Sequence, residues 1–280
     1  QNISLGFTPT EITFEEWSAQ WIKNKNVKSK TYESYVRNIK KLNKYIGKIR
    51  LTKLQPNNLE MVYGKYLEAG NSGSTVHQIH SVANNILKSA WKNGVITRDI
   101  GSLADAPSVK NRKPVILSQG ERERLFEAST QERDGLFLEF LSRTGMRAEV
   151  EGLATTWEQI DFEKGTVTVT SSKTNAGEGR VIPLHKGLLE RLEVRYAENE
   201  GKQLIDRNWN TNNYIFCNRE GNSHNLENLR RRMYRRVKLV AGVPQELTFH
   251  DLRHNYGSYL LHKDVNIAQI SKVLGHSSVA

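Results

Sequence analysis

Two histidines four residues apart, with an acid after the first, occur in the stretch TFHDLRHNYG. They are His250 and His254, and Asp251 and Arg253 lie between them. On a helix this spacing places both imidazoles on one side, as in the H-E-x-x-H helix of zinc proteases. Arg253, however, would hold a fixed positive charge within one turn of the metal, which disfavours a cation and favours an anion. From this segment alone, a zinc hydrolase and a purely structural histidine pair both stay open.

Three further segments carry groups that could act on the same anion. SRTGMRAEVEGL places Arg147 just after a Thr-Gly turn, at the start of a helix. An arginine there opposes the helix dipole unless the guanidinium and the free backbone N–H groups bind an anion together. SSKTNAGEGR places Lys173 at the mobile end of a hairpin, and VLGHSS places His276 at a helix end beside Gly275.

The composition is that of a soluble globular protein long enough for two domains. The chain has 280 residues, of which 37% are hydrophobic and 25% are charged. The sequence has no apparent signal peptide and no apolar run of membrane-spanning length, so no membrane partner is expected. The single cysteine, Cys217, cannot form an internal disulfide, which favours a reducing cytoplasm.

The net charge of +11 is partly concentrated in two basic blocks. Residues 21–53 contain eleven Lys or Arg and one acid, and residues 229–238 contain five Arg and one Lys. Such blocks are typical of a protein that binds nucleic acid, although a solvated helix face gives a similar pattern. The residues predicted to contact nucleic acid are Lys28, Lys30, Arg37, Lys40, Lys41 and Lys44 in the first block, and Arg230, Arg231 and Arg235 in the second.

The first hundred residues predict a small all-helical domain. Thr13 and Glu16 have the spacing of a capping box for the first helix, and a second helix is predicted over residues 29–46. Apolar residues in the second helix keep a helical period with lysines between them, so one side is apolar and the other basic. Residues 57–69 and a segment capped by Ser74 predict two more helices.

A polar segment with two prolines, residues 105–114, is predicted to be a linker. Helices follow it, and then the hydrophobic period changes to two in GTVTVTSSKTNAGEGRVIPL, which predicts a β-hairpin. Helical patterns return at residues 187–201, 226–240 and 250–274. The second domain should therefore be mostly helical with a small antiparallel sheet.

The motifs TGMR, SKT…GRVIPL, HDLRH and LGHSS occur in this order after a basic helical domain. Together they resemble the tyrosine recombinase (phage integrase) family of site-specific DNA recombinases, over nearly the whole chain. The resemblance implies a mostly α fold with an all-helical core-binding domain at residues 1–104, a linker at 105–114 and a mixed α/β catalytic domain at 115–280. The two domains are expected to clamp the DNA duplex from opposite sides.

The family's catalytic roles match five residues of this sequence. Arg147 and Arg253 match the two arginines that hold the nonbridging oxygens of the scissile phosphate. Lys173 matches the hairpin lysine that protonates the departing 5′ oxygen. His250 matches an acid–base and hydrogen-bonding partner of the phosphate site, and His276 matches a donor to a phosphate oxygen. No metal and no other cofactor is implied, because the arginines offset the charge that develops at phosphorus.

The sequence departs from the family pattern at two places. The family usually has an acid three residues after the first arginine, where this chain has Val150. Glu149 or Glu151 would have to brace Arg147 instead, and the sequence does not choose between them. The nucleophilic tyrosine is expected beyond Ala280, so residues 1–280 alone are expected not to cleave DNA.

Tyr256, Tyr259 and His254 are expected to have other roles. The two tyrosines lie inside the HDLRH helix, at the wrong place in the motif order for a nucleophile, and should be core or DNA-facing residues. His254 should support or pack against the site.

The predicted function is site-specific breakage and rejoining of DNA through a 3′-phosphotyrosyl intermediate, without metal or ATP. The resemblance implies a homotetramer on double-stranded recombination sites, at the nucleoid of a bacterial cytoplasm, encoded by a phage or mobile element. The alternatives are a DNA-binding module without catalysis and the zinc hydrolase; the separate binding domain disfavours a type IB topoisomerase. The sequence reveals neither the target site, nor the choice between phage, conjugative-element and chromosomal roles, nor an amino-terminal arm-binding domain.

Overall fold

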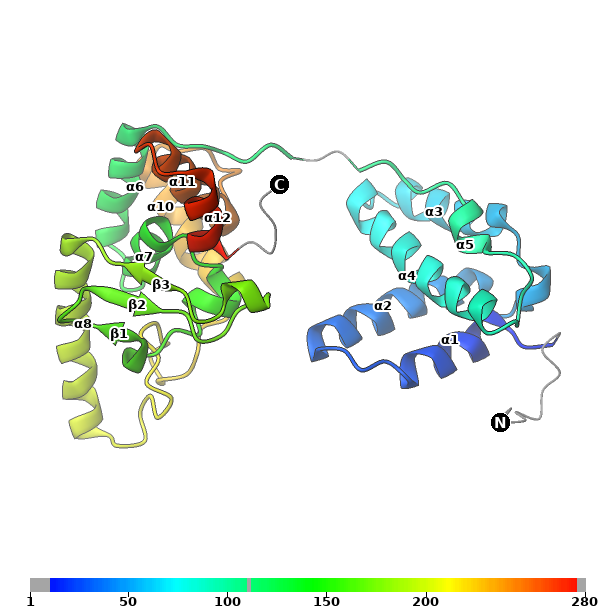
Figure 1. The fold of residues 1–280 in the computed structure, drawn as a ribbon, viewed down its shortest axis with the longest axis horizontal. Helices are drawn as coiled ribbons and strands as arrows, with labels where there is room; N and C mark the ends of the chain where they lie inside the picture. Colours follow the sequence, from blue (N-terminus) through cyan, green and yellow to red (C-terminus); the bar gives the residue numbers. More distant parts are fainter. Residues whose placement is uncertain (1–10, 110–111, 276–280) are drawn as a thin grey trace. The chain divides into compact units, whose positions relative to one another are not determined.

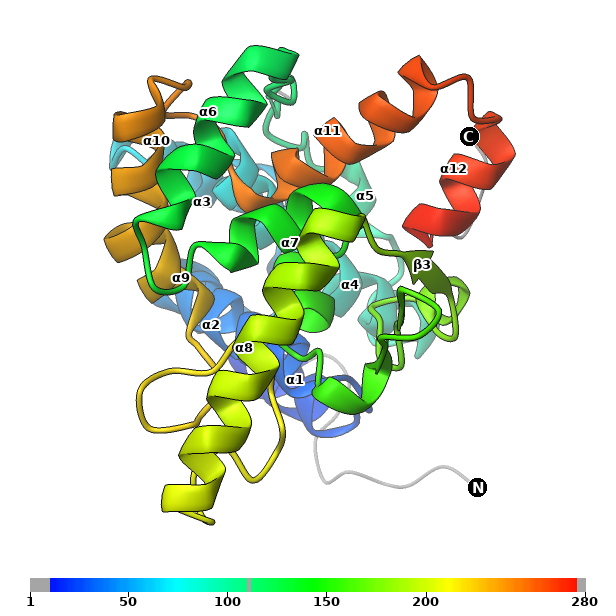
Figure 2. The same cartoon turned by 90° about the vertical axis from the view of Figure 1, so that its left-hand side faces the viewer.

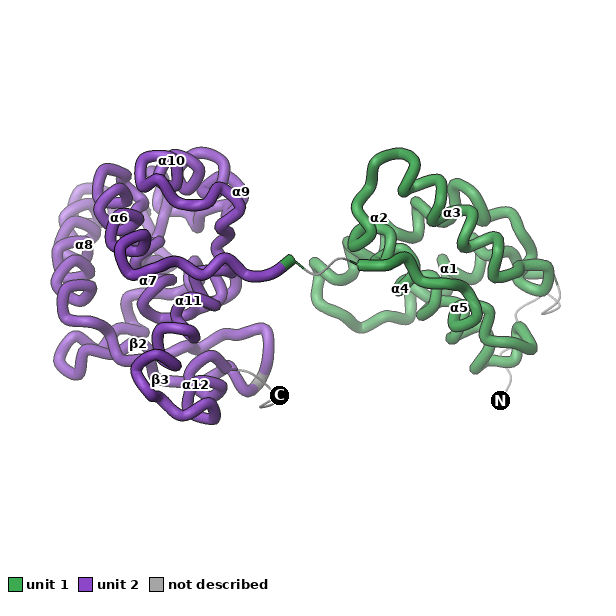
Figure 3. Tube along the Cα trace, turned by 90° about the horizontal axis from the view of Figure 1, so that it is seen from above, with its two compact units in different colours: residues 1–112 green, residues 113–280 purple. Residues whose placement is uncertain are grey.

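Two compact units make up the protein. The computed structural model describes residues 11–109 and 112–275. The chain divides into Gln1–Arg112 and Lys113–Ala280 (Figure 3). This boundary falls within residues 105–114, where the sequence predicts a linker. Among the helices in the described ranges, none is long and apolar enough to pass through a bilayer.

The first unit is all-helical within its described residues. Its elements are α1 (Phe14–Lys23), α2 (Ser29–Ile46), a 3-10 turn (Leu51–Lys53), α3 (Pro56–Glu68), α4 (Gly73–Lys92) and the short α5 (Ile100–Leu103) (Figure 1). The expected capping box is present, since Thr13 Oγ1 accepts a hydrogen bond from Glu16 N at 3.3 Å. α4 begins before the expected position, because Ser72 rather than Ser74 caps it.

α2 has one buried side and one basic side, as its period predicts. Ile39, Leu42 and Ile46 are buried in the core of the unit, together with residues of the other four helices. Of the lysines between these positions, Lys40 and Lys44 are exposed and Lys41 is half-buried. Burial of the apolar side thus holds the basic side outward.

The second unit combines helices with a small sheet (Figures 1 and 2). Its helices are α6 (Gln119–Thr130), α7 (Leu136–Thr144), α8 (Lys186–Ile205), α9 (Leu226–Leu229), α10 (Arg235–Ala241), α11 (Phe249–His262) and α12 (Ile267–Leu274). Two π turns (Ala148–Gly152 and Arg230–Tyr234) and two 3-10 turns (Trp157–Gln159 and Asn175–Gly177) complete it, with strands β1 (Ile160–Asp161), β2 (Thr166–Thr168) and β3 (Val181–Pro183).

The sheet is antiparallel, in the order β1-β2-β3. Val167 pairs with Ile182 across β2 and β3, and both side chains are fully buried. This pair forms the predicted hairpin, whereas the two-residue β1 was not expected. The expected class, mostly helical with a small antiparallel sheet, is confirmed.

α7 is the central helix of the second unit and is buried along nearly its whole length. Phe137 packs against Phe216 and Phe249, with ring centroids 5.0 and 5.9 Å apart. A helix that is buried on nearly every side belongs to the core and not to the surface. Because Phe249 begins α11, this packing also fixes α11 against α7.

The predicted helical stretch at residues 250–274 is divided into α11 and α12. Asp264 lies between them with φ of 56°, a left-handed conformation that an α-helix does not contain. The turn brings the end of α12 back beside α11, where Leu274 O accepts a hydrogen bond from Arg253 Nη2.

Candidate active site

Arg147 is positioned by the left-handed end of α7. Gly145 caps this helix with φ of 65°. A Cβ at Gly145 would lie 2.4 Å from Tyr256 Cδ1, so only glycine lets the helix end this close to α11. The buried Met146 follows, and Arg147 then begins the next turn. The Thr-Gly turn thus places Arg147 beside α11.

A π turn after Arg147 determines which acid braces it. Gly152 N donates to Arg147 O at 2.9 Å, five residues back. A π turn contains one more residue than an α turn. Glu151 is correspondingly four residues after Arg147, one residue later than the acid of the family pattern. Glu151 accepts from Arg147 N at 2.9 Å and from Arg147 Nη1 at 2.6 Å. Of the two acids that the sequence left open, Glu151 is therefore the brace.

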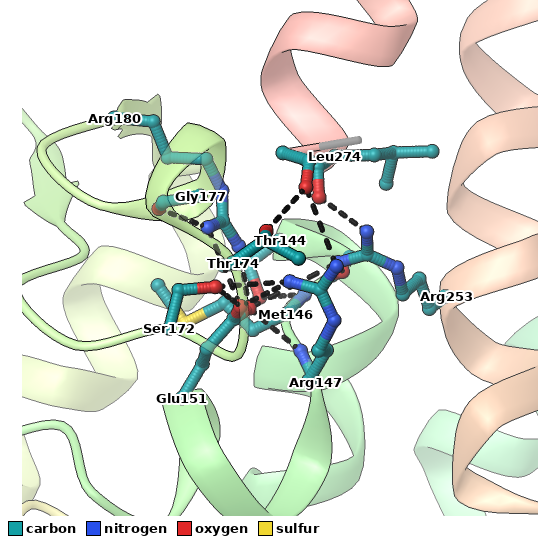
Figure 4. Close-up of polar contacts among 12 residues, drawn as sticks. Thr144, Met146, Arg147, Glu151, Ser172, Thr174, Gly177, Arg180, Arg253 and Leu274 are labelled. Carbon is teal, nitrogen blue, oxygen red and sulfur yellow. Dashed lines mark hydrogen bonds and ion pairs between the residues drawn. The ribbon is translucent and has the colours of Figure 1, made fainter. Parts of the chain in front are cut away.

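The Glu151 carboxylate is the centre of a buried network (Figure 4). Its side chain has 0% exposure. Besides Arg147, it contacts Arg180 Nη2 at 2.5 Å and Ser172 Oγ at 2.6 Å, and Arg253 Nη1 lies 3.9 Å away. Burial alone would raise the pKa of Glu151, but the hydrogen bonds from Arg180, Ser172 and the Arg147 backbone outweigh burial and lower the pKa from 4.5 to about 2. The carboxylate is therefore ionised at neutral pH.

The Arg253 side chain extends from α11 toward the Glu151 carboxylate. It is 4% exposed, and its Nη1 donates to Gly145 O at 2.8 Å. Burial, followed by the charge of Arg147, lowers the pKa of Arg253 from 12.5 to about 10, so it remains a cation at neutral pH. Arg253 Nη2 donates to Leu274 O, and Arg147 Nη2 donates to Gly275 O at 3.3 Å. Figure 4 shows both guanidinium groups directed toward the carbonyl oxygens at the end of α12.

Arg147, Arg180, Arg253 and Glu151 form what we call the arginine cluster. Three guanidinium groups contact one carboxylate, so the side chains of the cluster carry an excess of positive charge. The remaining acceptors given above are neutral carbonyl and hydroxyl oxygens. In a partly buried site such an excess favours a bound anion, and guanidinium groups match the oxygens of phosphate.

Lys173 is held next to the arginine cluster by its neighbours in sequence. Ser172 is buried on Glu151, and Thr174 Oγ1 donates to Gly275 O at 3.1 Å. The Lys173 side chain between them is exposed. The loop end that the sequence predicts as mobile is therefore anchored on both sides of the lysine.

The histidines lie along the exposed side of α11. The rings of His250 and His254 meet edge to face, with centroids 4.8 Å apart. Partial burial, then the charges of His254 and Arg253, lower the pKa of His250, so its imidazole is neutral at neutral pH and can accept a proton. His276 lies outside the described residues.

Asp251 lies in the first turn of α11 and forms a capping box with Thr248. Its carboxylate accepts from Thr248 N at 2.7 Å and from Thr248 Oγ1 at 2.8 Å. Within the described ranges, no three His, Cys, Asp or Glu side chains are grouped so that they could hold a metal ion. The Asp251 carboxylate is thus engaged by Thr248 and, at 3.4 Å, by Val115 N.

Tyr256 and Tyr259 line a separate pocket of about 790 Å³, together with Phe126 and Leu184. Tyr256 is 7% exposed, and the Arg122 guanidinium lies 4.9 Å from the centroid of the Tyr259 ring. Both tyrosines therefore face this pocket.

The predicted nucleic-acid contacts lie mostly at the surface. Exposed residues are Lys28, Lys30, Arg37, Lys40 and Lys44 around α2, and Arg230, Arg231 and Arg235 on the second π turn and α10. Lys41 is half-buried, with Nζ 5.7 Å from the centroid of the Tyr66 ring. Arg230 is paired with Glu227 at 2.6 Å.

Arg180 is the member of the arginine cluster to which the sequence assigned no role. It stands directly before β3 in the GRVIPL motif, and its side chain is 6% exposed. The available signal was an arginine at the start of an apolar strand, where burial requires a partner of opposite charge. The partner, Glu151, is 29 residues away in sequence.

Two family models match the chain, one in each unit. The model of the phage integrase family matches residues 116–280, and that of the phage integrase N-terminal SAM-like domain matches residues 13–66. The tyrosine recombinases XerD of Staphylococcus haemolyticus and Staphylococcus epidermidis are 23% and 24% identical over 264 residues, covering 91% of this chain and 87% of each relative.

Solved structures of integrases have the same fold. The Tn1549 transposon integrase in complex with transposon right end DNA gives a TM-score of 0.81 at 17% identity, over 96% of this chain and 92% of that one. A lambda integrase tetramer bound to a Holliday junction gives 0.75 at 20% identity, over 98% and 80%. Because the family model matches more than half of the sequence, the chain belongs to the phage integrase family of tyrosine recombinases.

Proposed function

We propose that this protein is a site-specific DNA recombinase that breaks and rejoins strands through a 3′-phosphotyrosyl intermediate, without metal or ATP. The observation that carries the proposal is the convergence of Arg147 and Arg253 on one set of oxygen acceptors, within a cluster that has excess positive charge. A phosphodiester supplies the negative charge that this cluster lacks.

Each catalytic group has a defined part in the proposed reaction. Arg147 and Arg253 bind the nonbridging oxygens and offset the charge that builds up as a tyrosine hydroxyl attacks phosphorus. The new bond joins tyrosine to the 3′ phosphate, and the bond to the 5′ oxygen breaks. Lys173 gives that oxygen its proton, His250 accepts a proton or a hydrogen bond at the phosphate, and His276 donates to a phosphate oxygen. Attack by a 5′ hydroxyl reverses the steps, so the phosphodiester energy is conserved.

The proposed partner is double-stranded DNA with specific recombination sites. The exposed lysines around α2 and the arginines at residues 230–235 supply phosphate contacts for it. A homotetramer is supported by the tetrameric lambda integrase on a Holliday junction. The setting is the bacterial cytoplasm, at the nucleoid, as part of the integration of a phage or other mobile element.

The proposal is tested by covalent capture. DNA duplexes that bind the full-length protein tightly are first selected from a random pool. Each duplex is then nicked at successive positions, so that cleavage releases a short fragment that diffuses away. We expect a protein–DNA adduct whose rate of formation falls about 10³-fold in Arg147→Ala, because the variant loses one of two phosphate-binding guanidiniums. Arg191→Ala is the matched control, since Arg191 pairs with the buried Glu139 elsewhere in the unit. Tight binding without any adduct would instead identify a DNA-binding module that lacks catalysis.

Lys173→Ala is expected to slow adduct formation about 10²–10⁴-fold on ordinary DNA. The loss should largely disappear when sulfur replaces the bridging 5′ oxygen, because a thiolate leaves without a proton whereas an alkoxide does not. The measurement is the single-turnover rate on both substrates. An equal loss on both would show that Lys173 is not the general acid.

A further inference from the structure

The hairpin loop, residues 172–180, is held at three points, two on Glu151 of the arginine cluster and one on Gly275 O. Ser172 Oγ donates to Glu151 Oε1 at 2.6 Å, and Thr174 Oγ1 donates to Gly275 O at 3.1 Å. At the end of the loop, Arg180 Nη2 donates to Glu151 Oε2 at 2.5 Å. The first and the last of these joints share the carboxylate that braces Arg147.

Arg180 also closes the loop on itself. Its Nη1 donates to Gly177 O and, at 3.4 Å, to Glu151 Oε1. The packing there leaves no spare room: a Cβ on Gly177 would lie 2.2 Å from Ser172 Oγ and 3.0 Å from Arg180 Nη1. One guanidinium therefore fixes both the shape of the loop and its position on the cluster.

The hydrogen bonds of the Arg180 guanidinium indicate that Arg180 acts through other residues and not by contacting DNA. Both Nη atoms are engaged by Glu151 and Gly177, and the side chain is 6% exposed, against 17% for Arg147. Lys173, in contrast, projects from the same loop into solvent. A group with this placement can orient the lysine and the first arginine without contacting DNA.

We propose that Arg180 is a positioning residue that couples the general acid to the phosphate clamp, by fixing the hairpin loop that carries Lys173 onto the Glu151 brace of Arg147. This proposal rests on the functions proposed above for Lys173 and Arg147. Its specific consequence is that loss of Arg180 impairs leaving-group protonation, and not only the stability of the fold.

The test compares Arg180→Met in the full-length protein on ordinary DNA and on DNA with a 5′-bridging sulfur. We expect the adduct rate to fall about 100-fold on ordinary DNA and about 10-fold on the sulfur substrate, which needs no general acid. Arg180→Lys should recover part of the rate on ordinary DNA, because an ammonium can still pair with Glu151. Arg191→Met, which breaks a comparable pair with buried Glu139, should change both rates by the same small factor.

Three outcomes would overturn the coupling. In the first, the adduct rate of Arg180→Met on ordinary DNA falls no further than that of Arg191→Met. In the second, the rate falls by the same factor on both substrates. In the third, the rate falls more on the sulfur substrate than on ordinary DNA, which would mean that the guanidinium acts directly on the reaction. If Arg180→Met does not fold, Gly177→Ala replaces it, since its Cβ displaces Ser172 Oγ without removing a charge. The same difference between substrates is then expected. Absence of an adduct in the unmodified protein would count against the proposed function itself.

Discussion

Replacing Glu151 by alanine is expected to destabilise the second unit by about 3–5 kcal/mol and to abolish measurable DNA cleavage. The substitution leaves three guanidiniums close together without the carboxylate that they share, and two of them are nearly inaccessible to water. Urea unfolding and the adduct assay measure the two effects. Glu139→Ala is the control, because Glu139 is also buried and contacts two arginines, Arg143 and Arg191.

The control should lose roughly half as much stability. Arg143 and Arg191 are 28% and 36% exposed, so they can turn toward water once Glu139 is removed. Arg180 and Arg253 are only 6% and 4% exposed and cannot. Equal losses of unfolding free energy in the two variants would mean that the burial of Arg180 and Arg253 does not add to the cost of removing their carboxylate.

The same carboxylate predicts a pH dependence. The pKa of Glu151 is lowered from 4.5 to about 2 in the folded protein, so its contribution to stability is complete above pH 4.5 and is lost as the pH falls toward 2. The loss is on the order of 3 kcal/mol over this window. Glu151→Gln should remove this component from the curve of unfolding free energy against pH, while components from other acids remain.

The sequence predicts those parts of the site that depend on local pattern. Arg147 follows a Thr-Gly turn, Arg253 lies on a capped helix, and the two faces of α2 follow from a helical period. Each of these features is set by residues within a few positions of one another. The resemblance to the integrase family then predicts that Arg147 and Arg253 come together at one phosphate.

Features that depend on tertiary contact were not predictable in the same way. The choice of Glu151 over Glu149 depends on a π turn, whose i→i+5 bonds have no distinct hydrophobic period. The role of Arg180 depends on its pairing with Glu151, which is 29 residues away in sequence and is brought close only by the fold. The division between α11 and α12 depends on Asp264 in a left-handed conformation, within a stretch whose apolar pattern continues through it.

Arg253→Lys is expected to reduce the adduct rate about 10³-fold while changing DNA affinity little. One ammonium cannot replace a planar group whose Nη atoms reach both Gly145 O and Leu274 O. Burial would also lower the pKa of a lysine there, and loss of its charge would remove the electrostatic contribution to the transition state.

DNA affinity should respond instead to the exposed cations. Arg253 is 4% exposed, whereas Lys28, Lys40 and Lys44 face solvent on the first unit, and salt-dependent affinity comes from many such accessible contacts. Equilibrium binding and single-turnover cleavage, measured on the same duplex with Arg191→Lys as control, separate the two quantities. If affinity and cleavage fell by the same factor in Arg253→Lys, Arg253 would be a binding residue and the transition-state role proposed for it would be wrong.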